Sequence, residues 1–298
     1  MNPAVCGSMA AVRCSMIGAD RMKRAYQKVM SVLLVCLFVI SGCSSGNSDA
    51  SASPKQVLLD AVEYSNQQEG FREEFDNEVT SEDGVNHTLS DSYIIFPSQA
   101  CYQVSFNNAV GGSYKDIYIG KYTQTDIAYI QGTPSSTSFR DMTVTNLDSY
   151  EGRNETLADR QYFTSLFEMF TANDVSEQVS FEMEKNDEGY RITITLTDMD
   201  RFNEINREKT LEEYGEDWYD PYLEFCMTVQ INKGIIQKVT WDEKANRDGV
   251  IQDRVSTATY TPCSIDQVDT ALIDDLVNQV KVGTISENSY LTLDGIVR

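Results

Sequence analysis

Apolar and polar residues alternate along most of the chain, and a period of two residues is typical of β-strands with one buried face. Phe71, Phe75 and Val79 share one face of such a segment, while Arg72 and Glu74 lie on the other. The alternation predicts about ten strands, near residues 71–79, 88–96, 102–106, 116–122, 126–131, 175–183, 190–196, 223–231, 235–241 and 251–260. The polar segment 132–153 is predicted to be a long surface connection.

Helical periodicity separates these groups of strands. The clearest case places Phe163, Leu166, Phe167 and Phe170 at i, i+3, i+4 and i+7, so one apolar stripe runs along the helix. Capping residues and terminal glycines predict a helix from Ser53 to Gly70, one opened by Asn154, one over 198–214 and one from Ser264 to Gly283. The order of elements is thus helix, five strands, helix, two strands, helix, three strands, helix.

The N-terminal region has the layout of a secretory signal, with basic residues before a short apolar run. The run 29–40 is too short to span a bilayer as a helix, which needs about twenty residues. It ends in Ile40-Ser41-Gly42-Cys43, which resembles the lipobox of bacterial lipoproteins. We therefore expect residues 1–43 to be a signal peptide. Translation from Met22 would also give a complete signal with its charges at the front.

The lipobox resemblance implies that Cys43 becomes the mature N-terminus and carries diacylglycerol on its sulfur. Two acyl chains hold a protein stably at a membrane, whereas one binds only reversibly. The expected location is therefore the extracytoplasmic face of the cell membrane, with the membrane itself as a partner. An ordinary signal peptide with a fortuitous cysteine is the alternative interpretation.

Composition limits the partners of the exported body. Residues 1–43 contain five of the 24 basic and one of the 46 acidic residues, so 19 and 45 remain and the mature net charge is about −26. A body this acidic is repelled by phosphate, which excludes nucleic acid as a partner. The Ser-rich residues 44–53 have the composition of a flexible tether that holds the body away from the membrane.

Few residues outside the anchor suggest catalysis. The single histidine, His87, is predicted to lie in a solvent-facing hairpin loop, and no nucleophile motif accompanies it. The three exported cysteines besides Cys43 are Cys101, Cys226 and Cys263, and we expect them to be small buried hydrophobic residues. Acidic clusters at 197–200 and 212–220 are interpreted as a helix N-terminus and a solvated loop. No cofactor or metal is expected.

One architecture accommodates these elements economically. It is an α+β fold in which a strongly curved antiparallel sheet of about ten strands, a half-barrel, holds helices on its concave face. Residues 54–283 would form this single domain, and residues 284–298 a loosely attached tail. The element order behind a lipobox resembles the LolA-like half-barrel superfamily, including mycobacterial lipoproteins of the LppX and LprG type. That resemblance implies binding of acyl chains or lipidated molecules between the sheet and the helices.

Three functions follow as hypotheses. The first is a non-enzymatic lipoprotein that binds a lipid or another hydrophobic ligand. Its predicted lining residues are aromatic: Phe71, Phe75, Tyr102, Phe106, Phe163, Phe167, Phe170 and Trp241. The second is a cell-surface interaction module with a solid core, acting through its acidic face on cell-wall polymer, calcium or a protein partner. The third, an enzyme, would require two carboxylates that meet in a cleft.

Overall fold

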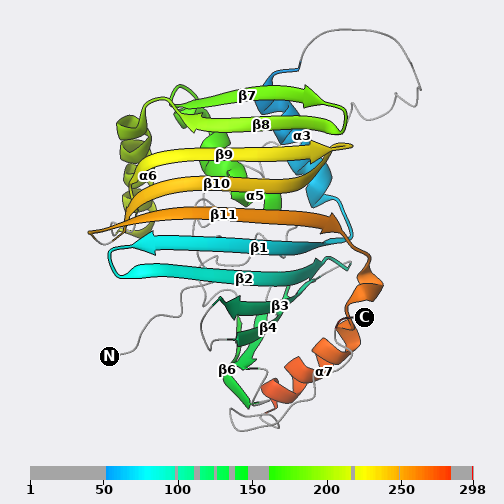
Figure 1. Ribbon diagram of the computed structural model, residues 1–298. Coiled ribbons are helices and arrows are strands. Elements are labelled where there is room, and N and C mark those ends of the chain that lie inside the picture. Colours follow the sequence, from blue (N-terminus) through cyan, green and yellow to red (C-terminus); the bar gives the residue numbers. More distant parts are fainter. Residues whose placement is uncertain are drawn as a thin grey trace, which may run out of the picture.

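The structure is a computed structural model of the chain (Figure 1). It describes residues 52–97, 100–110, 115–123, 126–133, 138–146, 161–215, 219–247, 249–282 and 297. The predicted signal peptide with Cys43, most of the tether and most of the C-terminal tail lie outside the described residues.

The described strands form one 11-stranded sheet in the order β6-β5-β4-β3-β2-β1-β11-β10-β9-β8-β7. Every pairing between neighbours is antiparallel. The strands are β1 (Gly70–Ser81), β2 (Gly84–Ile95), β3 (Cys101–Ala109), β4 (Lys115–Tyr122), β5 (Asp126–Thr133), β6 (Ser138–Asn146), β7 (Val179–Asn186), β8 (Gly189–Leu196), β9 (Tyr222–Asn232), β10 (Ile235–Arg247) and β11 (Val250–Pro262).

The sheet consists of two meanders, β1 to β6 and β7 to β11, joined along β1 and β11. This seam is long, and its register runs from Phe71 opposite Pro262 to Thr80 opposite Asp253. Figure 1 shows β7 to β11 with β1 and β2 as one broad surface, from which β3, β4 and β6 turn away. The sheet is therefore curved and unclosed, as the predicted half-barrel requires.

The predicted α+β fold class is confirmed, with two local differences. One more strand exists than the alternation suggested, because β6 lies inside the segment expected to be a surface connection. Thr143 and Thr145 alternate with Met142 and Val144 there, a weak pattern that the many polar residues obscure. Val175 belongs to a short 3-10 helix, η2 (Asn173–Val175), so β7 begins later than predicted.

Turn chemistry explains the β7 to β8 hairpin. Asn186 Oδ1 accepts hydrogen bonds from the backbone N–H groups of Glu188 and Gly189, at 3.0 and 2.8 Å. Gly189 has a φ of 151°, and a Cβ there would lie 2.1 Å from the carbonyl oxygen of Ile231 on the neighbouring strand. Only glycine fits this close approach, so the predicted turn over 186–189 is confirmed.

Two helices cover one face of the sheet. They are α3 (Pro54–Asn66) and α5 (Tyr162–Thr171), both drawn behind the broad surface in Figure 1. We call the face that they cover the inner face. Ser53 caps α3 as predicted, because its Oγ accepts a hydrogen bond from Gln56 N at 3.2 Å. Gly70 opens β1 instead of ending this helix. A Cβ at Gly70 would lie 2.7 Å from the Ile94 carbonyl oxygen on β2, so the close approach of the two strands requires glycine there.

The other helices lie elsewhere. α6 (Met199–Tyr214) runs beside the end of β9 and is capped by Asp198, whose carboxylate accepts a hydrogen bond from Arg201 N at 3.0 Å. This cap confirms that the first acidic cluster is a helix N-terminus. α7 (Thr270–Lys281) follows the short η3 (Ile265–Gln267). It is capped by Asp269, whereas the sequence pattern placed the start of this helix at Ser264.

α7 packs on the outer face of the sheet, opposite α3 and α5. Its buried residues Ile273, Leu276 and Val277 form a second core with apolar residues of β2, β3 and β4. The larger core lies on the inner face, between α3, α5, α6 and the strands β1 and β7 to β11. The prediction of helices on one face thus holds for α3 and α5, whereas the last helix covers the other side.

Val297 is the described residue of the predicted tail. It forms an antiparallel bridge with Val268 and packs against the second core.

Among the described residues, no helix is long and apolar enough to cross a membrane.

Candidate functional site

The phenylalanines of α5, predicted to line a ligand cavity, pack directly against the inner face. Phe163, Phe167 and Phe170 are 2%, 1% and 2% exposed. The Phe163 ring lies 5.0 Å from that of Phe71, and Phe170 stacks on Phe225 with centroids 4.7 Å apart. These distances are typical of packed aromatic pairs. The helix therefore lies flush on the sheet at these positions.

Trp241 and Phe75 also lie on the inner face, but nearer the middle of β10 and β1. Their ring centroids are 5.9 Å apart. Trp241 is buried, while Phe75 keeps partial contact with solvent. The structure thus brings together six of the eight predicted lining residues on one face. Whether any of them contacts a ligand stays a prediction.

Tyr102 and Phe106 lie on the outer face. On β3, Gln103 pairs with Ile94 of the inner-face core and therefore faces inward. Because side chains alternate along a strand, Tyr102 and Phe106 face outward. Tyr102 packs in the core beneath α7, and its hydroxyl donates a hydrogen bond to Asp274 at 2.9 Å. Phe106 is 38% exposed. These two residues cannot share a cavity with the phenylalanines of α5.

A pocket lies beside α3, where this helix passes over the turn between β9 and β10. Its volume is about 450 Å³, within the range of roughly 300–1,000 Å³ that is usual for ligand sites. We call it the α3 pocket, and its lining residues are Val57, Asp60, Ala61, Tyr64, Tyr190, Ile231, Lys233 and Gly234.

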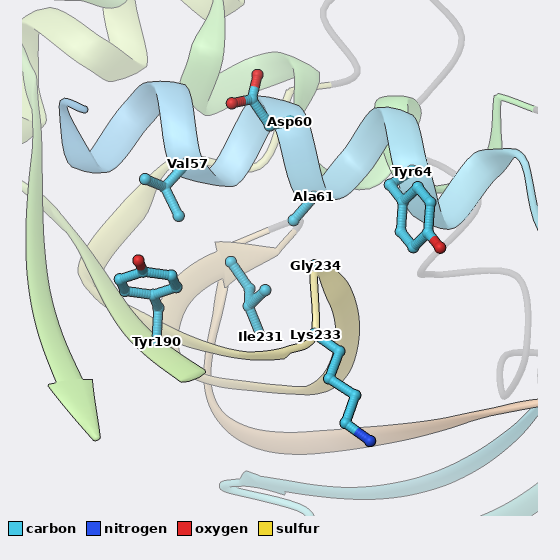
Figure 2. Close-up of a pocket in the computed structure, with 8 residues that line it drawn as sticks. All are labelled: Val57, Asp60, Ala61, Tyr64, Tyr190, Ile231, Lys233 and Gly234. Carbon is cyan, nitrogen blue, oxygen red and sulfur yellow. The ribbon is translucent and has the colours of Figure 1, made fainter. Parts of the chain in front are cut away.

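Figure 2 shows how the lining side chains are directed. Val57 and Ala61 point from the underside of α3 toward Tyr190 and Ile231 on the strands below. The Asp60 carboxylate points to the opposite side of the helix, and the Lys233 ammonium points away from it. Aliphatic and aromatic side chains thus face one another across the space between helix and strands, and the charged groups of Asp60 and Lys233 lie at its edge.

Local sequence explains the walls of the α3 pocket. Val57, Ala61 and Tyr64 lie at i, i+4 and i+7, so they share one side of the helix. The turn below uses left-handed backbone at Lys233 (φ 51°) and Gly234 (φ 80°), as a two-residue hairpin turn demands. A Cβ at Gly234 would make only an ordinary contact of 3.6 Å with the Tyr64 ring, so the backbone conformation, not space, favours glycine here.

Two hydrogen-bonded contacts fix α3 above the pocket. The buried Ser65 hydroxyl oxygen accepts a bond of 3.0 Å from the backbone N–H of Ile236. Asn66 binds the first turn of α5, because its Oδ1 accepts from Phe163 N at 2.9 Å and its Nδ2 donates to Thr164 Oγ1 at 2.9 Å. The roof of the pocket is thus joined both to the sheet and to the neighbouring helix.

One carboxylate lies on the inner face near the middle of the sheet. Glu73 accepts a hydrogen bond of 2.6 Å from the hydroxyl of Tyr162 on α5, and Tyr260 of β11 is its cross-strand neighbour. Burial raises the pKa of Glu73, and the hydrogen bonds from the two tyrosines only partly offset this effect. The site therefore favours the protonated form of Glu73.

The remaining sequence candidates have structural roles. His87 belongs to β2, not to a loop, and its Nε2 lies 2.7 Å from Asp76 Oδ1 on the outer face. Cys101 is buried as expected, but Cys226 is exposed and Cys263 is intermediate. Of the second acidic cluster, Asp220 binds Arg247 at 3.0 Å. The described residues contain no group of three or more metal-ligating side chains.

No protein-family model matches the sequence, and a search of curated proteins finds no match. Solved structures with a similar arrangement include the lipoprotein LppX from Mycobacterium tuberculosis, with 9% identity, a TM-score of 0.31 and coverage of 72% of this chain and 95% of that chain. LprF from Mycobacterium bovis has 8% identity, a TM-score of 0.33 and coverage of 70% and 91%. An outer membrane lipoprotein-sorting protein domain from Vibrio parahaemolyticus has 7% identity, a TM-score of 0.29 and coverage of 75% and 98%.

These likenesses are weak, and the description of the fold rests on the curved antiparallel sheet and the helices of this chain itself. At TM-scores this low, the likenesses carry no argument about function.

Proposed function

We propose that the protein is a membrane-anchored extracytoplasmic lipoprotein, attached through Cys43, that binds a hydrophobic ligand without catalysis. The observation that carries the proposal is the α3 pocket, in which aliphatic and aromatic side chains of the helix face those of the strands. Its volume suits a chain-like apolar ligand, and its charged residues stay at the rim, as expected for a site that accepts an acyl chain.

The position of the pocket supports the link to a membrane. α3 is the first helix after the predicted tether, and residues 44–53 can extend over at most about 35 Å. A pocket lined by this helix would therefore stay close to the bilayer that Cys43 is proposed to enter. A ligand could pass between membrane and pocket over a short distance.

Membrane attachment is tested with the full chain produced in a bacterium supplied with an alkyne-tagged fatty acid. Wild-type protein should incorporate the label and sediment with membranes. Cys43→Ser should lose the label and leave the membrane fraction. Labelling of the variant at the wild-type level would refute attachment at Cys43.

Ligand binding is tested by native mass spectrometry of residues 44–298, purified without detergent, because this segment retains every described contact. The informative variant is Val57→Trp, which fills the α3 pocket from a half-buried position. Glu63→Trp, on the exposed side of the same helix, is the matched control. Wild type and control should carry a lipid-sized mass, and Val57→Trp should show at least about tenfold lower occupancy. Equal occupancy in all three proteins would exclude this pocket.

A second function is favoured by the flush packing of α5. A solid core beneath this helix is what an interaction module would have, and the exposed carboxylates of Glu74, Asp76 and Glu78 line the outer face of β1. This module would bind calcium, cell-wall polymer or a basic protein. A bare polypeptide mass after incubation with host lipids, together with salt-dependent sedimentation on isolated cell wall, would favour it over ligand carriage.

A further inference from the structure

The α3 pocket has one ionic group on the side that an occupant would contact. Its lining contains one acid, Asp60, and one base, Lys233. The Asp60 carboxylate accepts a hydrogen bond of 2.7 Å from Gln56 Nε2 and points to the far side of α3, away from the strands (Figure 2). Lys233 lies at the edge of the pocket on the strand side, so its ammonium is the charge that an occupant would meet.

The Lys233 ammonium is available for binding. The residue is exposed, and its side chain forms no ion pair and no hydrogen bond with the residues that the structure describes. Other lysines of this acidic chain are already engaged, since Lys121, Lys209 and Lys244 lie 2.5, 2.9 and 3.5 Å from carboxylate oxygens. A ligand at Lys233 would therefore displace no existing contact.

The backbone at this position disfavours a lysine. Within the described part of the chain, Lys233 is the only residue other than glycine with a positive φ, 51°. A two-residue hairpin turn with left-handed backbone at both centres strongly favours Asn-Gly, and here the sequence is Lys233-Gly234. Backbone strain tends to be retained at binding sites, so we attribute the lysine to its side chain and not to the turn.

The pocket has a charged end and an uncharged end along α3. A Cβ at Gly234, the neighbour of Lys233, would lie 3.6 Å from the Tyr64 ring, so the lysine belongs to the Tyr64 end. Val57 and Tyr190 line the other end, about two helical turns away (Figure 2). An elongated occupant would thus lie along the helix, with its chain toward Tyr190 and its head at Lys233.

The acidity of the whole body does not prevent an anion from binding here. Exposed charges more than about 8 Å apart are largely screened at physiological ionic strength, so the groups in contact decide. The exposed acids of the neighbouring β7 to β8 turn, Asp187 and Glu188, form no ion pair with Lys233. A lysine ammonium on its flexible stem pairs readily with a carboxylate or phosphate, whereas it would repel a cationic head.

We propose that the α3 pocket binds amphiphiles with one anionic head, a carboxylate or a phosphate. The head pairs with the Lys233 ammonium, while the acyl chain lies between the helix and the strands. This inference rests on the proposed function and adds to it the chemical class of the ligand. A free fatty acid and a lipid with a terminal phosphate share this chemistry.

Calorimetric titration of residues 44–298 tests the proposal with four ligands that share one chain: decanoic acid, decyl phosphate, decanol and decylamine. At neutral pH we expect an anion to bind about fivefold more tightly than decanol, decylamine to bind least, and the preference to shrink at high salt. Binding of one anion alone would support the proposal and name the head group. Equal affinities for both anions and decanol would overturn this inference and leave the proposed function standing, whereas no binding of any ligand would overturn both.

Variants then locate the head group. Lys233→Asn removes the ammonium and gives the turn a residue that its backbone favours, so this variant should fold with an unchanged or higher Tm. It should bind decanol as wild type does and lose the preference for anions. Lys185→Gln is the matched control, because this exposed lysine lies opposite Tyr190, at the other end of the pocket. A folded Lys233→Asn that keeps the preference, or a Lys185→Gln that loses it, would refute the placement of the head at Lys233.

Discussion

Asn66, the last residue of α3, caps α5 by accepting a hydrogen bond from the backbone N–H of Phe163 at 2.9 Å. The residue directly before α5, Gln161, makes no side-chain cap of its own. The N-terminus of α5 has no local side-chain cap and is completed by a residue of α3, which couples the two helices.

Replacement of Asn66 tests this coupling. Asn66→Ala removes both the acceptor for Phe163 N and the donor to Thr164, and should lower the free energy of unfolding by about 1–2 kcal/mol. Asn66→Asp keeps the acceptor at the helix N-terminus and should lose less than half of that amount. Urea denaturation followed by circular dichroism measures both. Equal losses would mean that the cap contributes nothing.

Asp274 should hold α7 on the outer face. Its Oδ1 accepts hydrogen bonds from Lys121 Nζ at 2.5 Å and from the Tyr102 hydroxyl at 2.9 Å. The side chains of Asp274 and Lys121 both remain partly exposed. Asp274→Ala should therefore cost only about 1 kcal/mol, and hydrogen exchange should accelerate in α7 while α3 stays protected. Asp275→Ala, one position along on the exposed side, is the control. Faster exchange in α3 as well would contradict a local effect.

The cysteines should react in a fixed order. Cys226 is exposed, Cys101 is fully buried, and burial raises the pKa of Cys263 to about 11 from an ordinary value of 9.0. At pH 8 the thiolate fraction of Cys263 is then about 100-fold below that of an ordinary thiol. Iodoacetamide with peptide mapping should label Cys226 first, Cys263 slowly and Cys101 only after unfolding. Rapid labelling of Cys263 in folded protein would contradict the predicted pKa.

Glu73 should make stability depend on pH. Because burial raises its pKa in the folded state, folding favours the protonated form, and stability present below the ordinary pKa of 4.5 is lost as pH rises through the folded value. Glu73→Gln removes the charge but can still accept from Tyr162. The variant should have a higher Tm than wild type at pH 7.5, and the two should converge near pH 4. A difference that grows on acidification would refute this assignment.

The sequence pattern predicts the strands well, but it predicts poorly on which face of the sheet their side chains lie. Alternation correctly groups Tyr102 with Phe106, but both sides of β3 carry apolar residues, since Cys101 is buried as well. Only the position of α7 determines which side Tyr102 joins. A contact between segments so distant in the chain leaves no local trace, so two lining residues were predicted on the wrong face.

The α3 pocket was missed for a related reason. The spacing of Val57, Ala61 and Tyr64 is visible in the sequence, but it accompanies the stronger buried stripe of the same helix. Ile231 enters the pocket only because the turn at Gly234 meets the helix. Surface hollows of this kind depend on where elements end, which periodicity predicts least well.

The seam between β1 and β11 also determines when the chain can finish folding. Residue 71 pairs with residue 262, so the first strand has one open edge until almost the whole chain is present. Pairing over such a separation folds slowly, and an unpaired strand edge invites association with other chains in the meantime. The N-terminal meander of a chain shortened before β11 would keep that edge exposed, and aggregation of such fragments is the expected cost of building the sheet from its two ends.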